Sequence, residues 1–521
     1  MKKRNGFAVL AAVGMLFGTV GVAHADTPIN FSFGPASGPP GTVMTVTGTG
    51  CTPSSDVTKP NNLILQGQGT TPSQGPFNFT TQTQPSGAFT FPVNTTGFAA
   101  GSYLPVLSCP GNPDHPSALG TSFYTVTVVP VTGATYVPLT PTRILDTRNG
   151  TGTGGGSNPV GPGATIDLQV TGVGGVPASG VAAVALNVTA TGATGPGSYL
   201  TIYPTGSTQP LASNLNFNPG TAIPNLVIAR VGPSGKVSIY NNLGSVHVVG
   251  DVQGYYADSQ TSGSTYVPVN PLRVLDTRTG TGVAQAQVPA GGTISLTVAG
   301  VNGVPANATA VVLNMTTTQA TGPESFLSVY PSDGTLPTVS NLNFTSGPPS
   351  TNAVVARVGT DGKVKIYNNL GSTDVVADLN GYFAAPVAVG TAPPGQVYYP
   401  INPIRALDTR NGTGTPGGVS GQLGAGNTID LAVAGVGGVS TGATAVVLNV
   451  TAADSPGPES YLTLFPSGTA RPLASNLNFV AQQTVPNLVM VRLNNGKVSI
   501  YNNLGSVAVI ADIQGFYAAA A

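Results

Sequence analysis

Short runs that are rich in Val, Ile, Tyr and Thr follow one another along most of the chain, and in residues 42–47 apolar and polar positions alternate. Clear examples are residues 42–47, 181–189, 199–203, 225–230 and 236–240. Gly, Pro and Asn separate these runs, and such residues mark turns. Alternation with a period of two, in β-branched and aromatic residues, is typical of β-strands. The pattern therefore predicts an all-β protein built from many short strands.

One strand pattern occurs three times between residue 136 and the C-terminus. Each copy opens with Pro-x-Arg-x-Leu-Asp-Thr-Arg, carries Ser-Asn-Leu-Asn-Phe in its middle, and closes with Tyr-Asn-Asn-Leu-Gly-Ser followed by Asp-x-x-Gly-Tyr or Asp-x-x-Gly-Phe. The aspartates of the opening segments, Asp146, Asp276 and Asp408, lie 130 and 132 residues apart. Solenoid repeats are about 20–50 residues long, so this longer period indicates complete domains in tandem.

These copies predict three domains of the same fold. We expect three tandem homologous β-sandwich domains, jelly-roll-like, at residues 136–258, 266–385 and 398–521. The Asn-Asn-Leu-Gly-Ser stretch of each copy is predicted to be a hairpin turn. Short linkers rich in Ser, Thr, Gly or Pro join the copies, so the expected shape is an extended rod of modules in series.

The N-terminus has the three parts of a secretory signal peptide. Basic residues 2–4 precede an apolar run at residues 7–23, and small residues flank His24 at the end of that run. A retained membrane anchor is the alternative, but the run is short and interrupted by glycines. We expect residues 1–25 to be removed, which leaves no membrane span and makes the mature protein secreted, in the medium or on the cell surface.

Residues 26–130 carry strand candidates with a different sequence pattern. Short strands at this spacing predict an all-β sandwich. The chain has two cysteines, Cys51 and Cys109, and an even pair in an exported protein predicts a disulfide. The Ser-Gly-Pro-Pro-Gly-Thr opening at residues 37–42 and the Cys pair resemble Ig-like modules of bacterial surface proteins. The resemblance implies an N-terminal Ig-like sandwich.

The three copies resemble modules of secreted and cell-surface proteins of high-GC Gram-positive bacteria. The shared features are the Pro-x-Arg-x-Leu-Asp-Thr-Arg opening, the Ser-Asn-Leu-Asn-Phe middle and the Asp-x-x-Gly-Tyr-like end. Modules of this kind occur alone, in arrays or attached to extracellular hydrolases. The resemblance implies an extracellular location and carries no activity that can be transferred to this chain.

Charge is scarce and balanced. The chain has 18 basic and 18 acidic residues, a net charge of zero, and no Trp. Without a basic excess, binding to nucleic acid is not expected. A net charge of zero favours association over repulsion, so self-association, another surface protein or a cell-envelope glycan are the expected kinds of partner.

Ionic residues recur in register in all three copies. An Arg, an Asp and a second Arg stand in each opening segment, and one Asp stands near each end. Bidentate Arg–carboxylate pairs would tie the first and last strands of a copy together; an anionic-ligand or glycan site is the alternative. The candidate ion-pair residues are Arg143, Asp146, Arg148, Asp251, Arg273, Asp276, Arg278, Asp378, Arg405, Asp408, Arg410 and Asp512.

A Tyr-Asn-Asn segment also recurs and combines an aromatic face with amide donors and acceptors. Glycan-binding surfaces use this chemistry, whereas Asn also favours turns and Tyr also packs in cores. The candidate ligand-site residues are Tyr240, Asn241, Asn242, Tyr367, Asn368, Asn369, Tyr501, Asn502 and Asn503.

The sequence offers no catalytic constellation. A glycosidase would need two free carboxylates, but Asp146 and Asp251 each have an Arg as candidate partner. His115 and His247 are the histidines of the mature chain and have no counterparts in the other copies, so a Ser-His-Asp triad is not expected. No cofactor motif or metal-ligand spacing occurs, although a calcium ion held by backbone carbonyls and Asn or Asp side chains stays an open alternative.

The expected function is therefore that of a secreted, non-catalytic structural or adhesive protein of the bacterial cell surface or extracellular matrix. The alternative is a glycan- or cell-wall-binding module array, which predicts one defined ligand. An extracellular hydrolase is the least favoured hypothesis. Repetition of one module favours the first two hypotheses, since a weak site that is used several times gains avidity.

Overall fold

The computed structural model forms two compact units, Met1–Pro130 and Val131–Ala521. It describes residues 133–258, 263–384 and 395–520, which we call modules 1, 2 and 3, and nine strands of the N-terminal unit. Residues 1–25 and both cysteines lie outside the described residues, so the predicted signal peptide and disulfide stay predictions. Every element described is a strand except one short 3-10 helix, Pro416–Gly418, so the all-β prediction is confirmed.

The described strands of the N-terminal unit form two sheets. One sheet has three strands in the order β1-β3-β6, and the other has the order β2-β9-β7-β4-β5 with β8 paired to β7. All pairs are antiparallel except β2 with β9, which is parallel. The strands are β1 Asn30–Gly34, β2 Ser37–Gly38, β3 Val43–Thr49, β4 Asn62–Gly69, β5 Phe77–Gln82, β6 Phe89–Asn94, β7 Gly101–Ser108, β8 Ser117–Leu119 and β9 Tyr124–Val126.

Module 1 consists of two antiparallel sheets of four strands. The sheet that faces the other two modules, which we call the inner sheet, has the order β10-β17-β12-β15. The sheet on the far side of the module, which we call the outer sheet, has the order β11-β16-β13-β14. One hydrophobic cluster, which includes Leu145 and Leu186 of the inner sheet and Leu200 and Ile239 of the outer sheet, lies between them. The strands are β10 Thr135–Asp146, β11 Thr165–Gln169, β12 Val181–Thr194, β13 Ser198–Pro204, β14 Leu215–Phe217, β15 Ile223–Arg230, β16 Lys236–Asn241 and β17 Ser245–Ala257.

Modules 2 and 3 repeat this strand order. Module 3 adds β27 Leu423–Gly424 beside β34. The inner sheets are β18 Thr265–Asp276, β25 Asp374–Ala384, β20 Ala308–Thr318 and β23 Ser350–Arg357, and β26 Val397–Asp408, β34 Ser506–Ala518, β29 Ala445–Ala453 and β32 Val485–Arg492. The outer sheets are β19 Thr293–Thr297, β24 Lys363–Asn368, β21 Ser325–Pro331 and β22 Leu342–Phe344, and β28 Thr428–Ala432, β33 Lys497–Asn502, β30 Ser460–Pro466 and β31 Leu477–Phe479.

The Asn-Asn-Leu-Gly-Ser stretch does not join two strands of one sheet. In module 1 it connects β16 of the outer sheet to β17 of the inner sheet. The predicted hairpin is therefore wrong, and the stretch carries the chain across the module.

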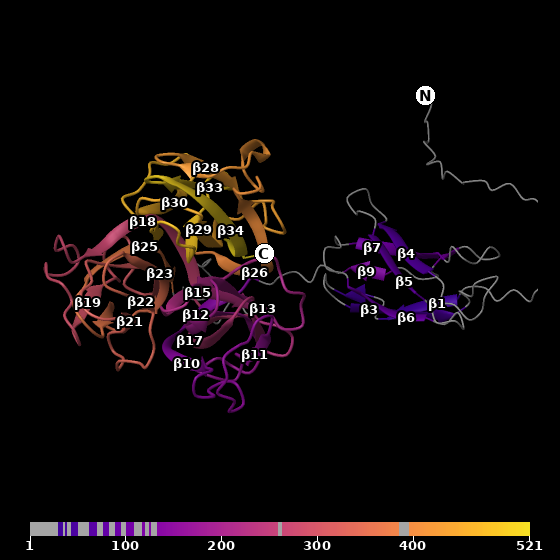
Figure 1. Cartoon of the computed structure of the whole chain (residues 1–521), viewed down its shortest axis with the longest axis horizontal. Helices are drawn as coiled ribbons and strands as arrows, with labels where there is room; N and C mark the ends of the chain where they lie inside the picture. Colours follow the sequence, from indigo (N-terminus) through magenta and orange to yellow (C-terminus); the bar gives the residue numbers. More distant parts are fainter. Residues whose placement is uncertain are drawn as a thin grey trace, which may run out of the picture. The chain divides into compact units, whose positions relative to one another are not determined.

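The three modules form a closed ring, not a rod (Figure 1). Their inner sheets face one another and share a single hydrophobic cluster. At its centre lie two aromatic rings from each module, with neighbouring ring centroids 4.3–6.4 Å apart. Each inner sheet has a second apolar face, opposite the face that packs in the core of its own module, and this second face needs a partner. The expectation of an extended rod is therefore wrong for these modules. The six rings are Tyr136, Tyr256, Tyr266, Phe383, Tyr398 and Tyr517.

Burial of both faces of the inner sheets explains their composition. Residues 183–190 of β12 are all buried, although successive side chains point to opposite sides of a strand. A strand that is covered on both faces has a nearly continuous apolar run, as in Val181-Ala-Ala-Val-Ala-Leu186. One face packs in the core of module 1, and the other packs on the ring axis.

Backbone hydrogen bonds close the ring at all three boundaries. The residue two positions before each opening Tyr pairs with the opening Tyr of the preceding module. Ser264 pairs with Tyr136, and Gln396 pairs with Tyr266. Ala134 completes the circle with Tyr398, at 2.8 Å in both directions.

The Gly of each Asp-x-x-Gly motif makes room for an opening Tyr. A Cβ atom on Gly254 would lie 2.3 Å from the hydroxyl of Tyr136, and Gly381 and Gly515 have the same relation to Tyr266 and Tyr398. The Tyr136 hydroxyl donates to the backbone carbonyl of Gln253 over 3.1 Å. The repeated Gly is therefore required by side-chain packing.

A cycle of buried asparagines links the inner sheets. In each bond the Nδ2 of an Asn in one module donates to the Oδ1 of an Asn in its neighbour. The three bonds are Asn225 to Asn449 at 2.7 Å, Asn352 to Asn187 at 2.8 Å and Asn487 to Asn314 at 2.8 Å. Since unpaired amides in this apolar setting are costly, the cycle favours one register of the three sheets.

Candidate functional site

The ionic residues of module 1 form one network at the edge of the inner sheet. Arg143 binds Asp251 in a bidentate manner, with Nε–Oδ1 2.8 Å and Nη2–Oδ2 3.2 Å, and its Nη1 lies 3.5 Å from Asp146. Arg148 binds the same Asp146 through Nε at 2.9 Å and Nη2 at 2.7 Å. Arg143 and Asp251 stand opposite each other in the β10–β17 register, so this pair joins the first and last strands of the module.

The networks of modules 2 and 3 have the same geometry. Nε of the first Arg lies 2.9 Å from Asp378 in module 2 and 2.5 Å from Asp512 in module 3. Nη2 of the second Arg lies 2.7 Å from Asp276 in module 2 and 2.8 Å from Asp408 in module 3. All twelve residues that the sequence singled out are thus brought together in three groups of four. The arginines are Arg273, Arg278, Arg405 and Arg410.

The two carboxylates of each network have opposite pKa shifts. Hydrogen bonds from Arg148 hold the pKa of Asp146 below its ordinary value. Burial raises the pKa of Asp251, because desolvation outweighs the attraction of Arg143. Asp251 also accepts a hydrogen bond from the backbone N–H of Ser340 in module 2. Each network therefore lies at a boundary between modules.

The middle Asn of each Tyr-Asn-Asn segment is buried. The Nδ2 of Asn241 donates to the backbone carbonyls of Val160, Gly161 and Gly244 at 2.9–3.1 Å. Asn368 and Asn502 make equivalent bonds. These three amides fix the chain crossing, and their side chains are not exposed to a ligand.

The Tyr and the last Asn of each segment are only partly buried. The hydroxyls of Tyr240, Tyr367 and Tyr501 donate to the Oδ1 of Asn242, Asn369 and Asn503 over 3.3–3.4 Å. In module 3 the guanidinium of Arg471 lies over the Tyr501 ring, 4.0 Å from its centroid.

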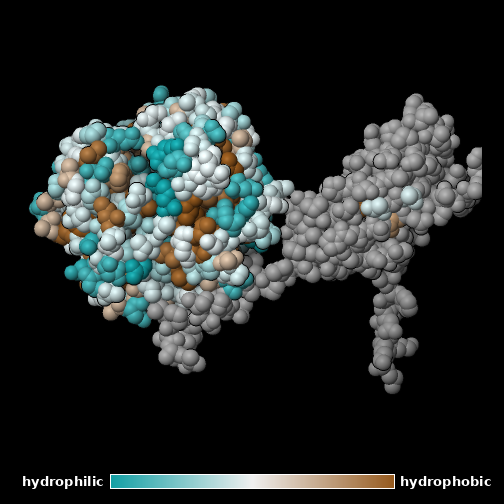
Figure 2. All heavy atoms as spheres, turned by 90° about the horizontal axis from the view of Figure 1, so that it is seen from below, coloured by the Kyte–Doolittle hydropathy of each residue, from teal (hydrophilic) through white to brown (hydrophobic). Residues whose placement is uncertain are grey.

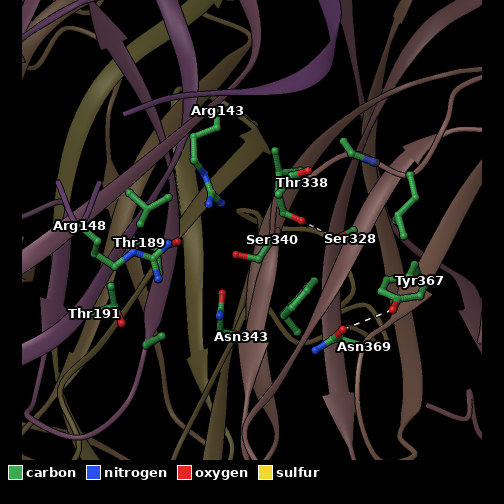
Figure 3. Close-up of a pocket in the computed structure, with 16 residues that line it drawn as sticks. Arg143, Arg148, Thr189, Thr191, Ser328, Thr338, Ser340, Asn343, Tyr367 and Asn369 are labelled. Atoms are coloured by element: carbon green, nitrogen blue, oxygen red, sulfur yellow. Dashed lines mark hydrogen bonds between the residues drawn. The ribbon is translucent and has the colours of Figure 1, made fainter. Parts of the chain in front are cut away.

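A cleft of about 450 Å³ brings Arg residues of module 1 and a Tyr-Asn pair of module 2 together (Figure 3). Arg143 and Arg148 line one side, and Tyr367 and Asn369 line the other. We call this site cleft 1–2. Its other lining residues are Thr189, Thr191, Ala222 and Val249 of module 1, and Phe326, Ser328, Leu336, Pro337, Thr338, Val339, Ser340 and Asn343 of module 2.

The boundary of modules 2 and 3 carries a smaller version, cleft 2–3, of about 240 Å³. Arg273 and Arg278 replace the arginines of cleft 1–2, and Tyr461 replaces Phe326. At the boundary of modules 3 and 1, the N–H of Ser213 donates to Asp512 over 3.4 Å, as Ser340 does to Asp251.

The sequence pattern indicates the Arg set and the Tyr-Asn set as separate sites within one module. The structure brings them together across a boundary, which no spacing along one module indicates. It also adds Ser340 and Asn343, which belong to the repeated Ser-Asn-Leu-Asn-Phe motif. That repetition was the available signal, but the motif alone does not show that it faces another module.

The surface around the clefts is mixed. Figure 2 shows apolar and polar residues interspersed on the visible face of the three modules, with several small apolar patches. Leu211 and Leu473 are 81% and 82% exposed.

Within the described residues, no cluster of three metal-ligating side chains occurs. In the same part of the chain, no helix has the length and apolar character needed to cross a membrane.

Comparison with known proteins does not assign a family. No family model and no curated protein matches the chain. The structure of Sulfolobus turreted icosahedral virus aligns with 74% of this chain and 91% of its own, at 10% identity and a TM-score of 0.16. The CBM22 tandem domain of Paenibacillus barcinonensis Xyn10C covers 49% of this chain and 100% of its own, at 9% identity and 0.15. A tetra-tandem repeat of a large adhesion protein covers 95% of this chain and 96% of its own, at 12% identity and a TM-score of 0.16. TM-scores of 0.15–0.16 do not indicate a shared overall fold.

Proposed function

We propose that this protein is a secreted, non-catalytic adhesive protein of the bacterial cell surface or extracellular matrix, and that it binds envelope glycans at a boundary between two of its modules. The observation that carries the proposal is cleft 1–2, where two guanidinium groups, several hydroxyls, two amides and two aromatic rings converge from two modules. This combination matches the alternating polar and apolar faces of a sugar ring. The signal-like N-terminus and the resemblance to surface modules support the location.

A non-catalytic role is supported by how the carboxylates are used. Asp146 accepts hydrogen bonds from Arg148, and Asp251 accepts them from Arg143. Glycoside hydrolysis needs one carboxyl group to donate a proton and another to act as base or nucleophile. Carboxylates held in bidentate pairs are poorly suited to either task, so we assign these networks to fixing the module boundaries.

We also infer that each module is a jelly-roll-like β-sandwich and that residues 26–130 form an Ig-like sandwich. Two sheets around one hydrophobic cluster support the first inference. A three-stranded sheet beside a larger one, together with the Cys pair, supports the second.

Co-sedimentation tests the proposed function. The purified protein is mixed with isolated envelopes of a high-GC Gram-positive bacterium or with insoluble polysaccharides, and a tube without glycan controls for self-assembly. We expect saturable pelleting that depends on the glycan. Pelleting without glycan would instead support a self-assembling coat, and no pelleting in any tube would point to a protein partner.

A further inference from the structure

Cleft 1–2 contains two buried polar atoms without a hydrogen-bond partner within the described residues. They are Oγ1 of Thr189, a residue that is 4% exposed, and Oδ1 of Asn343. A buried polar atom left unpaired reduces stability, and proteins rarely keep one without a reason. Asn343 as a whole residue is half-buried, and its amide carries both an acceptor oxygen and a donor nitrogen.

The equivalent side chains of cleft 2–3 are satisfied by the protein. Thr316 Oγ1 lies 3.3 Å from Thr351 Oγ1, and Asn478 Nδ2 donates to the same Thr351 hydroxyl. Thr351 stands opposite Thr316 in the β20–β23 register. The residue opposite Thr189 in module 1 is Pro224, which has no hydroxyl. The presence of Thr351 in module 2, where module 1 has Pro224, therefore decides whether side chains of the protein itself pair with the polar atoms of the cleft.

A second difference acts in the same direction. Arg471 of module 3 covers the Tyr501 ring, whereas module 2 has Leu336 at the matching position and leaves Tyr367 on the cleft wall. The volume of cleft 2–3 is about half that of cleft 1–2. At the third boundary, the amide of Asn216 is partnered by the hydroxyl of Ser213 at 3.2 Å. Oγ1 of Thr451, which stands opposite Pro486, has no partner within the described residues, so this boundary is satisfied only in part.

We propose that cleft 1–2 binds a neutral, hydroxyl-bearing sugar unit, and that cleft 2–3 is a copy closed by its own side chains. This inference rests on the proposed function and specifies its ligand. The two arginines of cleft 1–2 are balanced by Asp146 and Asp251, so the site has no excess positive charge for a carboxylate or phosphate. A sugar hydroxyl both donates and accepts, which suits Asn343 and Thr189.

Groups at the cleft wall complete the proposed site. Arg148 is 49% exposed, and its bonds to Asp146 use Nε and Nη2, which leaves Nη1 for a sugar oxygen. Phe326 and Tyr367 lie side by side, with ring centroids 6.5 Å apart, and offer apolar faces to the carbons of a sugar ring.

The test is calorimetric titration of the whole protein with neutral gluco-, manno-, galacto- and N-acetylglucosamine oligomers, and with galacturonate oligomers as charged counterparts. We expect a neutral oligomer to bind and Asn343→Ala to weaken it about tenfold or more, the effect of losing a well-placed hydrogen bond. The matched control is Asn478→Ala in cleft 2–3, which should leave the affinity unchanged. Preferential binding of galacturonate would overturn the neutral-ligand assignment.

Pro224→Thr provides a test that does not depend on damage to the protein. The new hydroxyl should pair with Thr189 and Asn343 as Thr351 pairs in cleft 2–3, so this variant should be at least as stable as the wild type and bind more weakly. Conversely, the double variant Thr351→Pro, Arg471→Leu should open cleft 2–3 and add one binding site per chain.

The outcomes separate this inference from the proposed function. If the wild type binds envelope glycans while Asn343→Ala and Pro224→Thr bind equally well, the protein is glycan-binding but cleft 1–2 is not the site. If the wild type binds no glycan in either assay, both proposals fail.

Discussion

Individual residues of the repeated motifs have separate structural roles. In Asp-x-x-Gly, Asp251 accepts the bidentate bonds of Arg143 and Gly254 makes room for Tyr136. In Leu-Asp-Thr-Arg, Asp146 is shared by Arg143 and Arg148. The motif residues thus hold the first and last strands of each module together, which explains why they recur while the loops differ.

The ion pairs predict a pH-dependent contribution to stability. The pKa of Asp276 lies below its ordinary value of 3.8, chiefly because Arg278 donates hydrogen bonds to it. Such a group stabilises the fold at pH values above its ordinary pKa and loses this effect as the pH falls through the lower folded value. We expect Asp276→Asn to cost about 1–3 kcal/mol at pH 7, since Arg278 is 39% exposed and water screens part of the interaction.

Thermal unfolding of the whole protein between pH 7 and pH 3 measures this contribution. The difference in Tm between wild type and variant should shrink below pH 3.8, because the Asp276 carboxylate of the unfolded chain is protonated there while that of the folded protein is still ionised. Asp454→Asn, at an exposed position, serves as control. A difference that stays constant over this range would argue against the ionised carboxylate as its cause.

At the scale of elements, the last strand of each module also reaches into the next module. On β17, Gln253 Oε1 accepts from the N–H of Val355 in module 2 over 3.2 Å. On β34, Gln514 Oε1 accepts from the N–H of Ile228 in module 1 over 3.1 Å. The equivalent residue on β25 is Asn380, whose Oδ1 has no partner within the described residues. One of three matching strand contacts is therefore incomplete.

Lengthening this side chain should complete the set. We expect Asn380→Gln to raise the free energy of unfolding by about 0.5–1.5 kcal/mol, because the longer side chain would reach the N–H of Met490, which matches Val355 and Ile228 in position. Denaturant unfolding measures the change, and Gln253→Asn should cause a comparable loss. A neutral or destabilising Asn380→Gln would show that the boundary of modules 2 and 3 has no room for the longer group.

At the scale of the whole molecule, the ring has one boundary without a linker. Modules 1 and 2, and modules 2 and 3, are joined by the chain, whereas modules 3 and 1 meet only through non-covalent contacts. These include the Ala134–Tyr398 pair and a hydrogen bond of 2.7 Å between the hydroxyls of Tyr256 and Tyr517. Module 2 has Phe383 at the position where modules 1 and 3 have Tyr256 and Tyr517. The hydroxyl pair therefore lies at the boundary that has no linker.

A shared axial core predicts that the three modules unfold together. We expect Ile500→Ala, in the separate core of module 3, to cost about 2–5 kcal/mol and to shift the unfolding of all three modules. Scanning calorimetry, with hydrogen exchange of module 1 amides as the local probe, measures this shift. Separate transitions, with module 1 unaffected by the substitution, would show that the modules are thermodynamically independent.

The strands, the three copies and the residues that pair within a copy follow from the amino-acid sequence alone. Period-two alternation, turn residues and repetition are local signals, and Arg143, Asp146 and Asp251 recur in register because their partners lie in the same copy. The sequence does not predict the ring, although the inner strands carry apolar residues on both faces. Which surface covers the second face depends on contacts between residues more than 100 positions apart, such as Tyr136 with Phe383 at 4.3 Å. Cleft 1–2 exists only because that face is covered by a neighbouring module, so its geometry was decided by the tertiary structure.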